Sequence, residues 1–117
     1  MLQIFTTGGT IDKVYFDAKS DFKVGDPQIA EILSSGGVTF DYAVETLLRK
    51  DSLEITDDDR TRIVQHVLDT EADRILITHG TDTMAVTGRA IEAALRFQPG
   101  STKTVVLVGS LTPARFR

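Results

Sequence analysis

Hydroxyl and acidic side chains gather in three short, glycine-containing segments of this chain. Residues 6–10 read Thr-Thr-Gly-Gly-Thr, residues 78–83 read Thr-His-Gly-Thr-Asp-Thr, and residues 109–113 read Gly-Ser-Leu-Thr-Pro. Glycine allows positive φ and a close backbone approach, so each segment could bring N–H groups and a hydroxyl up to a ligand. Single Gly-Thr turns also occur for structural reasons, because threonine often caps helices. Three such segments in one chain favour a ligand site over three unrelated turns.

The sequence also excludes several kinds of site. It has no Gly-Lys-Ser/Thr of a phosphate loop, no Gly-x-Gly-x-x-Gly and no Gly-x-Ser-x-Gly nucleophile elbow. The absence of cysteine excludes a disulfide framework, a thiolate metal site and a cysteine nucleophile. The acidic run at residues 57–59 is expected to complement a helix dipole rather than to bind a metal. We therefore expect no metal and no cofactor.

The apolar pattern indicates alternating strands and helices. Short runs rich in β-branched residues predict strands, and the last two have no polar face, as is typical of buried parallel strands. Helical spacing separates these runs, and Thr56 is the expected N-cap of the second helix. The predicted strands are residues 2–5, 42–44, 74–78 and 104–108, and the predicted helices are residues 27–35, 57–71 and 82–97. This order predicts an α/β fold with three layers, a mostly parallel sheet with helices on both faces, and a flavodoxin-like topology.

This topology places the three glycine segments at one edge of the sheet. Ligands of open α/β sheets bind outside the carboxyl ends of the strands, which is where each segment lies. Thr81 and Asp82 would then begin a helix, whose N–H groups and dipole favour an anion. Residues 12–26 show no helical period, and a loop of about fifteen residues in a compact domain is often functional. This segment is expected to form a hairpin or a mobile lid.

Length and charge limit the function further. The chain has 117 residues, of which 41% are hydrophobic and 26% charged, values that fit one globular domain with a real core. The formal net charge is −4 and no basic stripe is present, so a nucleic-acid partner is not expected. No apolar run reaches the ~20 residues of a membrane helix, and no signal peptide is evident. We expect a protein of the cytoplasm without a membrane partner.

The motifs in the glycine segments resemble a known family. Residues 7–11 (Thr-Gly-Gly-Thr-Ile) and 77–84 (Ile-Thr-His-Gly-Thr-Asp-Thr-Met) are similar to the two signatures of the bacterial-type L-asparaginase and glutaminase-asparaginase family. Residues 109–113 resemble the Gly-x-Met-Arg-Pro segment of that family, in the same order and with compatible spacing. The resemblance implies an asparaginase-like N-terminal domain over residues 1–117, with a lid loop at about residues 11–26 and without the family's C-terminal domain.

The resemblance also implies roles for individual residues. Thr10 would be the nucleophile that attacks the side-chain amide of L-asparagine and forms an acyl-enzyme, releasing ammonia and then L-aspartate. Thr81 would help to activate the nucleophile or the attacking water, and Asp82 would hold the substrate's α-ammonium group. Asp51 and Ser52 resemble a Gly-Ser pair whose serine holds the α-carboxylate. The residues expected to bind substrate are Gly9, Asp51, Ser52, Gly80, Thr81, Asp82 and Ser110.

The sequence departs from the family pattern at two positions. Phe22 stands where the family's loop carries a tyrosine, and phenylalanine has no hydroxyl to move a proton. Tyr15, five residues after Thr10, is a substitute that a hairpin could return to the site, although it could equally be an ordinary hairpin aromatic. The family's catalytic lysine lies further along than this chain extends. Lys103 precedes the last predicted strand, so we expect it at the opposite edge of the sheet.

These departures leave more than one function open. One hypothesis is an amidohydrolase acting on asparagine, with glutamine as a further substrate. The alternatives are a catalytically incomplete domain that binds an amino acid or a dicarboxylate, or an inactive fragment of a longer asparaginase. His79 is expected to be a hydrogen-bonded structural residue. Open sheet edges, together with the resemblance, predict a homodimer or a homotetramer.

Overall fold

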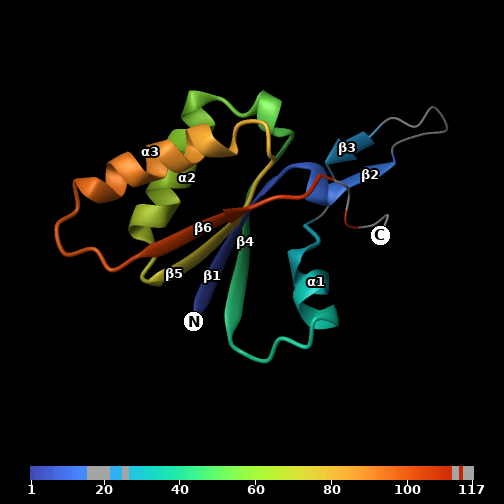
Figure 1. Cartoon of the computed structure of the whole chain (residues 1–117), viewed down its shortest axis with the longest axis horizontal. Helices are drawn as coiled ribbons and strands as arrows, with labels where there is room; N and C mark the ends of the chain where they lie inside the picture. The colour runs from blue at the N-terminus through green and yellow to red at the C-terminus, as the bar shows by residue number, and fades with distance from the viewer. Residues whose placement is uncertain (16–21, 25–26, 112–113, 115–117) are drawn as a thin grey trace.

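A computed structural model gives the arrangement of residues 1–15, 22–24, 27–111 and 114. Its centre is a parallel sheet of four strands in the order β4-β1-β5-β6 (Figure 1). The strands are β1 (Leu2–Gly8), β4 (Tyr42–Lys50), β5 (Arg74–Thr78) and β6 (Thr104–Val108). The first strand therefore lies between the second and third strands of the sheet in chain order, as in a flavodoxin-like topology.

Helices cover both faces of this sheet, as the sequence predicts. Figure 1 shows α2 and α3 together on one face and α1 on the other. Two single-turn 3-10 helices, η1 and η2, follow β1 and β4. The bounds are α1 (Ile29–Ser35), α2 (Asp57–Asp69), α3 (Met84–Arg96), η1 (Thr10–Asp12) and η2 (Ser52–Glu54). None of these helices is long and apolar enough to cross a membrane. The predicted α/β class is confirmed.

A small antiparallel hairpin lies beyond the carboxyl edge of the sheet. It consists of β2 (Lys13–Tyr15) and β3 (Phe22–Val24), and its register pairs Tyr15 with Phe22 (Figure 1). Of the two expectations for residues 12–26, the structure shows the hairpin. The rest of the predicted lid loop, residues 16–21 and 25–26, lies outside the described residues.

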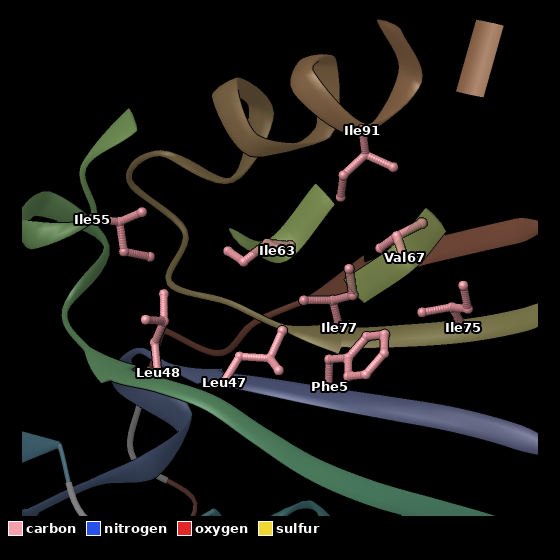
Figure 2. Packing of buried hydrophobic residues seen from close by; sticks show 9 residues of the cluster. All are labelled: Phe5, Leu47, Leu48, Ile55, Ile63, Val67, Ile75, Ile77 and Ile91. Atoms are coloured by element: carbon pink, nitrogen blue, oxygen red, sulfur yellow. The ribbon is translucent and has the colours of Figure 1, made fainter. Parts of the chain in front are cut away.

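The main hydrophobic core fills the space between the sheet and the pair α2 and α3 (Figure 2). Phe5, Ile75 and Ile77 project from β1 and β5 toward Ile63 of α2 and Ile91 of α3, and each of these side chains is at most 3% exposed. Burial of a side chain of this size contributes about 1.5–3 kcal/mol. The core therefore fixes the relative positions of β1 and β5, whose carboxyl ends carry the first two glycine segments.

Strand β4 is longer than the sequence predicts. The prediction stops at residue 44, whereas the strand continues to Lys50. Its middle residues, residues 44–46, are all exposed at the sheet edge, so the alternation of polar and apolar residues that marks a strand is missing there. A register shift against β1, between Thr6 and Gly8, then buries the adjacent Leu47 and Leu48 together. This irregular end carries the chain into the Asp51–Ser52 turn.

Candidate active site

The first glycine segment rests directly on the second. Gly8 and Gly9 have φ values of 100° and 90°, a region that side chains with a Cβ rarely adopt. A Cβ on Gly9 would lie 2.6 Å from the backbone nitrogen of Gly80, so the absence of a side chain permits this contact. The Gly9 N–H donates to the Lys50 carbonyl at 3.0 Å, which joins the same turn to the end of β4. Thr10 follows at once, half-buried, as the first residue of η1.

The second segment also packs against the turn after β4. A Cβ on Gly80 would lie 2.5 Å from Ser52 Cβ and 2.7 Å from Ser52 Oγ. From the same segment, the Thr83 hydroxyl donates to the Ser52 carbonyl at 2.8 Å. Ser52 is 1% exposed, and its own hydroxyl has no hydrogen-bond partner among the described residues. The turns after β1, β4 and β5 thus meet around a buried hydroxyl that can still donate or accept.

The third segment closes against the second. A Cβ on Gly109 would lie 2.5 Å from the His79 carbonyl oxygen and 3.2 Å from the Thr81 methyl carbon Cγ2. Ser110 follows Gly109 and is half-buried. The structure therefore brings all three glycine segments together at the carboxyl edge of the sheet, where the sequence places them. Thr112 and Pro113 lie outside the described residues.

The structure corrects the expected position of Thr81 and Asp82. Helix α3 begins at Met84 and its N-cap is Thr83, so Thr81 and Asp82 precede the helix instead of opening it. The Thr83 side chain makes no capping hydrogen bond, because its hydroxyl is used in the contact with Ser52. Thr81 and Asp82 are exposed at the edge of the sheet. Both residues are therefore accessible to solvent. The N–H groups and the dipole of a first helical turn, which the sequence predicts at these two residues, are not located there.

Sequence reasoning missed Lys13 as a residue of this region. Its Nζ lies 2.8 Å from Asp51 Oδ2, so an ion pair joins the turn after β1 to the turn after β4. The hydrogen bond from Lys13 is the largest cause that lowers the pKa of Asp51 below its ordinary value. A signal was present, because side chains three residues apart in a 3-10 turn lie on the same face, and Lys13 is three residues after Thr10.

His79 is the buried support of the second segment, as expected from the sequence. It is 0% exposed, and its Nδ1 lies 2.7 Å from the Gly80 carbonyl oxygen. A carbonyl only accepts, so Nδ1 carries the proton and Nε2 of the neutral ring accepts from the Thr87 hydroxyl at 2.8 Å. Arg60 Nε in turn donates to Thr87 Oγ1 at 3.2 Å. This series of hydrogen bonds fixes the position of the Gly80 carbonyl relative to α2 and α3.

The remaining candidates lie away from the edge or outside the described residues. Lys103 is at the opposite edge, as predicted, where its ammonium group donates to the carbonyls of Thr70 and Ala72. The backbone of Tyr15 lies in β2, but its side chain is outside the described part of the structure. Within the described residues, no group of three or more histidine and acidic side chains is placed to hold a metal ion.

Comparison with known proteins identifies the family. The family model described as asparaginase, N-terminal, matches residues 1–117. The chain belongs to the asparaginase family. An L-asparaginase of Thermococcus kodakarensis is 35% identical over 117 residues, which cover 96% of this chain and 34% of that protein. A component of the glutamyl-tRNA(Gln) amidotransferase of Thermoplasma acidophilum is 36% identical over 93 residues, which cover 77% of this chain and 23% of that component.

Solved structures of the asparaginase family have the same fold. The thermostable L-asparaginase from Thermococcus kodakarensis superimposes with a TM-score of 0.68 at 29% identity, covering 97% of this chain and 34% of that one. A probable cytoplasmic L-asparaginase from Campylobacter jejuni gives 0.72 at 28% identity, covering 97% and 35%. This chain therefore spans about a quarter to a third of the length of the relatives it matches.

The contact between Gly80 and Ser52 predicts that a single methyl group disrupts the site. Gly80→Ala would place its Cβ 2.5 Å from Ser52 Cβ, and overpacking of this kind costs about 1–3 kcal/mol of unfolding free energy. Gly88→Ala in α3 is the matched control, because its nearest neighbour, Leu107 Cδ1, is 4.0 Å away. The control should be stabilised by up to about 1 kcal/mol, since alanine favours a helix. Urea unfolding measures both, and equal effects would contradict the packing described.

The environment of His79 predicts a pH dependence of stability. Burial is the largest cause that lowers the pKa of His79 below 6.5; the charge of Arg60 lowers it further, and the hydrogen bond to Gly80 opposes both. Below about pH 6.5 the unfolded chain therefore binds more protons than the folded chain. The contribution of neutral His79 to the unfolding free energy is fully present above that pH and decreases as the pH drops below it. Urea unfolding between pH 7.5 and 5 should show this slope.

His79→Gln should flatten the slope in this pH range, whereas His66→Gln should retain it. The lowered pKa values of Asp51 and Asp59 act in a separate window, because their contribution is lost only as pH falls below about 3.8. An identical slope in the wild type and in His79→Gln would show that the buried imidazole is not its source.

Proposed function

We propose that this chain carries the nucleophile half of an L-asparagine amidohydrolase site, as the N-terminal domain of an asparaginase. The observation that carries the proposal is the contact of Gly9 with Gly80 and of Gly80 with Ser52. It brings the turns that bear Thr10, Ser52 and Thr81-Asp82 to one place. Parallel strands put these turns at one edge of the sheet, and the glycines allow their backbones to approach closely there.

The proposed reaction begins at Thr10. Its hydroxyl oxygen adds to the side-chain amide carbon of asparagine, the hydroxyl proton passes to the leaving nitrogen, and the C–N bond breaks to release ammonia. Water then hydrolyses the threonine ester and gives L-aspartate. The Gly9 N–H is already bound to the Lys50 carbonyl, so Gly9 contributes close backbone approach rather than a hydrogen bond to the substrate.

Substrate binding in this proposal uses the groups around Ser52. The buried Ser52 hydroxyl lacks a partner among the described residues, and a substrate α-carboxylate would supply the acceptor. The carboxylate of Asp82, exposed at the same edge, would bind the α-ammonium group. Thr81 and Ser110 contribute hydroxyl groups from the second and third segments. Asparagine is the proposed substrate, and glutamine, which is longer by one methylene group, is the second substrate to test.

Tyr15 is the proposed replacement for the tyrosine that the family carries at the position of Phe22. The hairpin register pairs Tyr15 directly with Phe22, so the two residues occupy facing backbone positions on adjacent strands. Its proposed role is to assist proton transfer from Thr10.

A second candidate function is a domain that binds an amino acid or a dicarboxylate without turnover. The position of Lys103 favours it, because this lysine is bound to backbone carbonyls at the opposite edge and cannot pair with Thr81 or Asp82. In this case the same residues would bind aspartate, and asparagine would stay intact.

The location and the assembly state belong to the same proposal. A cytoplasmic location is supported by the relative from Campylobacter jejuni, which is named a probable cytoplasmic L-asparaginase. A homodimer or homotetramer is supported by the two edge strands, on which Val44 and Val106 are 39% and 52% exposed. Uncovered sheet edges with apolar side chains favour association with a further protein surface.

Removal of the proposed nucleophile tests the amidohydrolase directly. Thr10→Ala should reduce ammonia release from L-asparagine by at least about 1,000-fold, because no other hydroxyl is proposed to form the ester. Thr102→Ala is the control, since its hydroxyl bonds Asp73 at the far edge of the sheet. Equal rates for the wild type and Thr10→Ala would exclude catalysis by Thr10, and absence of ammonia from the wild type would favour the binding domain.

Calorimetric titration with L-aspartate tests the pocket itself. Ser52→Ala and Asp82→Asn should each weaken binding by about 10-fold or more, the usual effect of losing a hydrogen bond to a charged group. Ser101→Ala, on an exposed turn at the opposite edge, should bind as the wild type does. Unchanged affinity in both site variants would exclude the proposed pocket.

A further inference from the structure

Arg60 extends from helix α2 to a buried hydroxyl group of helix α3. The Arg60 side chain is only 11% exposed, although a charged side chain is usually found in water. Its Nε donates to Thr87 Oγ1 at 3.2 Å, and Thr87 is 0% exposed. Its Nη1 lies 3.2 Å from Asp57 Oδ1, in a side chain that is fully exposed. An exposed ion pair contributes little to stability, so the bond to Thr87 is the contact that holds Arg60 inward.

The hydrogen bonds that lead from Arg60 to the second glycine segment all run in one direction. A guanidinium group only donates, so the bond from Arg60 occupies a lone pair of Thr87 Oγ1. The hydroxyl proton of Thr87 is then available for His79 Nε2, at 2.8 Å. At the far end, the Gly80 carbonyl only accepts, and it binds the proton on Nδ1 at 2.7 Å. The imidazole is thus held at both nitrogens, in one tautomer and one orientation.

The Gly80 carbonyl belongs to the peptide group that leads into Thr81. A peptide group is planar, so fixing its oxygen fixes the plane from which the Thr81 backbone continues. Gly80 itself has no side chain that could restrict this peptide. Beyond Thr81, the Thr83 hydroxyl is bound to the Ser52 carbonyl at 2.8 Å. Thr81 therefore lies between two anchors, one of which is the His79 ring.

We propose that Thr87 and Arg60 are positioning residues for the reaction at this edge of the sheet. Thr87 fixes the His79 ring, and Arg60 fixes the hydroxyl proton of Thr87. The ring in turn keeps the peptide before Thr81 in the orientation that the reaction needs. The side-chain partners of Arg60 among the described residues are Thr87 and Asp57, so Arg60 acts only through other residues. This inference rests on the function proposed above and adds to it two residues outside the site.

Two substitutions at Thr87 separate the effect of its hydroxyl from that of its shape. Thr87→Val keeps the branched shape and removes the hydroxyl, whereas Thr87→Ser keeps the hydroxyl. Thr87→Val should lower kcat for ammonia release from L-asparagine by about 10-fold or more, since small displacements of reacting groups have effects of this size. The KM should change by less than about 2-fold, because the bond from Thr83 to Ser52 stays intact. Thr87→Ser should retain most of the wild-type kcat.

Arg60 allows the same comparison. Glutamine carries an N–H at the place along the side chain where arginine has Nε, whereas methionine carries a methyl group there. Arg60→Met should therefore lower kcat as Thr87→Val does, and Arg60→Gln should restore most of it without restoring the charge. Arg62→Met is the matched control, because Arg62 is an exposed arginine of the same helix. It should leave kcat unchanged.

Nitrogen NMR of the isotope-labelled His79 ring gives a measurement that does not depend on turnover. At about pH 7.5 the wild type should show a neutral ring with its proton on Nδ1, and this proton should exchange slowly with water. Exchange should be faster in Thr87→Val and Arg60→Met, and close to wild type in Thr87→Ser and Arg60→Gln. The spectrum of His66→Gln assigns the signals, because the chain has 2 histidines.

The inference requires that kcat and proton exchange change together across these variants. It is overturned by an Nε2-protonated ring in the wild type, or by a wild-type kcat in Thr87→Val and Arg60→Met. It is also overturned if Thr87→Ser and Arg60→Gln lose as much kcat as the other two variants, since the loss then follows from packing. Urea unfolding shows whether each variant folds, and if one deletion variant does not, the pair at the other residue decides.

Failure of the proposed function gives a different pattern. A wild-type chain that releases no ammonia refutes hydrolysis, and the role of Thr87 and Arg60 in the reaction with it. A wild-type chain that releases ammonia at a rate that Thr87→Val and Arg60→Met share refutes only the positioning role.

Discussion

The close contact of backbone segments at the carboxyl edge of the sheet is the constraint on which the site depends. Gly9 contacts Gly80, Gly80 contacts Ser52, and Gly109 contacts the His79 carbonyl. In each contact the backbones are so close that a Cβ on the glycine would clash with its neighbour. These contacts need no large side chain, and they leave the hydroxyl groups between them as the main functional groups. The chemistry proposed for the site follows from that arrangement, because the proposed nucleophile and binding groups all come from the adjoining turns.

Buried polar bonds stabilise this arrangement from beneath. The Thr7 hydroxyl donates to the Thr78 carbonyl at 2.7 Å and joins β1 to β5 just before their glycine turns. His79, with both ring nitrogens bonded, connects the Gly80 carbonyl to Thr87 in α3. Each of these groups is fully or almost fully buried, so losing a partner would leave a buried polar atom without a bond. Such networks give the turns one geometry instead of several.

Local patterns predict some elements well and others poorly. The strand at residues 74–78 matches its predicted bounds, because a buried parallel strand is a continuous apolar run. The strand at residues 104–108 also matches its bounds, but the prediction that it is buried is wrong, since β6 is an edge strand without a fully buried residue. The apolar pattern underestimates the length of strand β4. An exposed edge strand pairs through its backbone hydrogen bonds, which do not depend on the pattern of its side chains. The apolar pattern also predicts that α3 begins at Asp82, two residues too early. The Thr83 hydroxyl donates to the Ser52 carbonyl, and the sequence gives no sign of this contact.

By itself, the sequence determined the α/β class, the family motifs and the edge of the sheet at which Thr10, Thr81 and Asp82 lie. Periodicity and chain order are sufficient for this, because parallel strands put all of their carboxyl ends on one side. Only the tertiary structure decided that Lys13 pairs with Asp51 and that Ser52 is buried under Gly80. These contacts join residues that are 38 and 28 positions apart in the chain, and no local pattern encodes a distance between side chains on different turns.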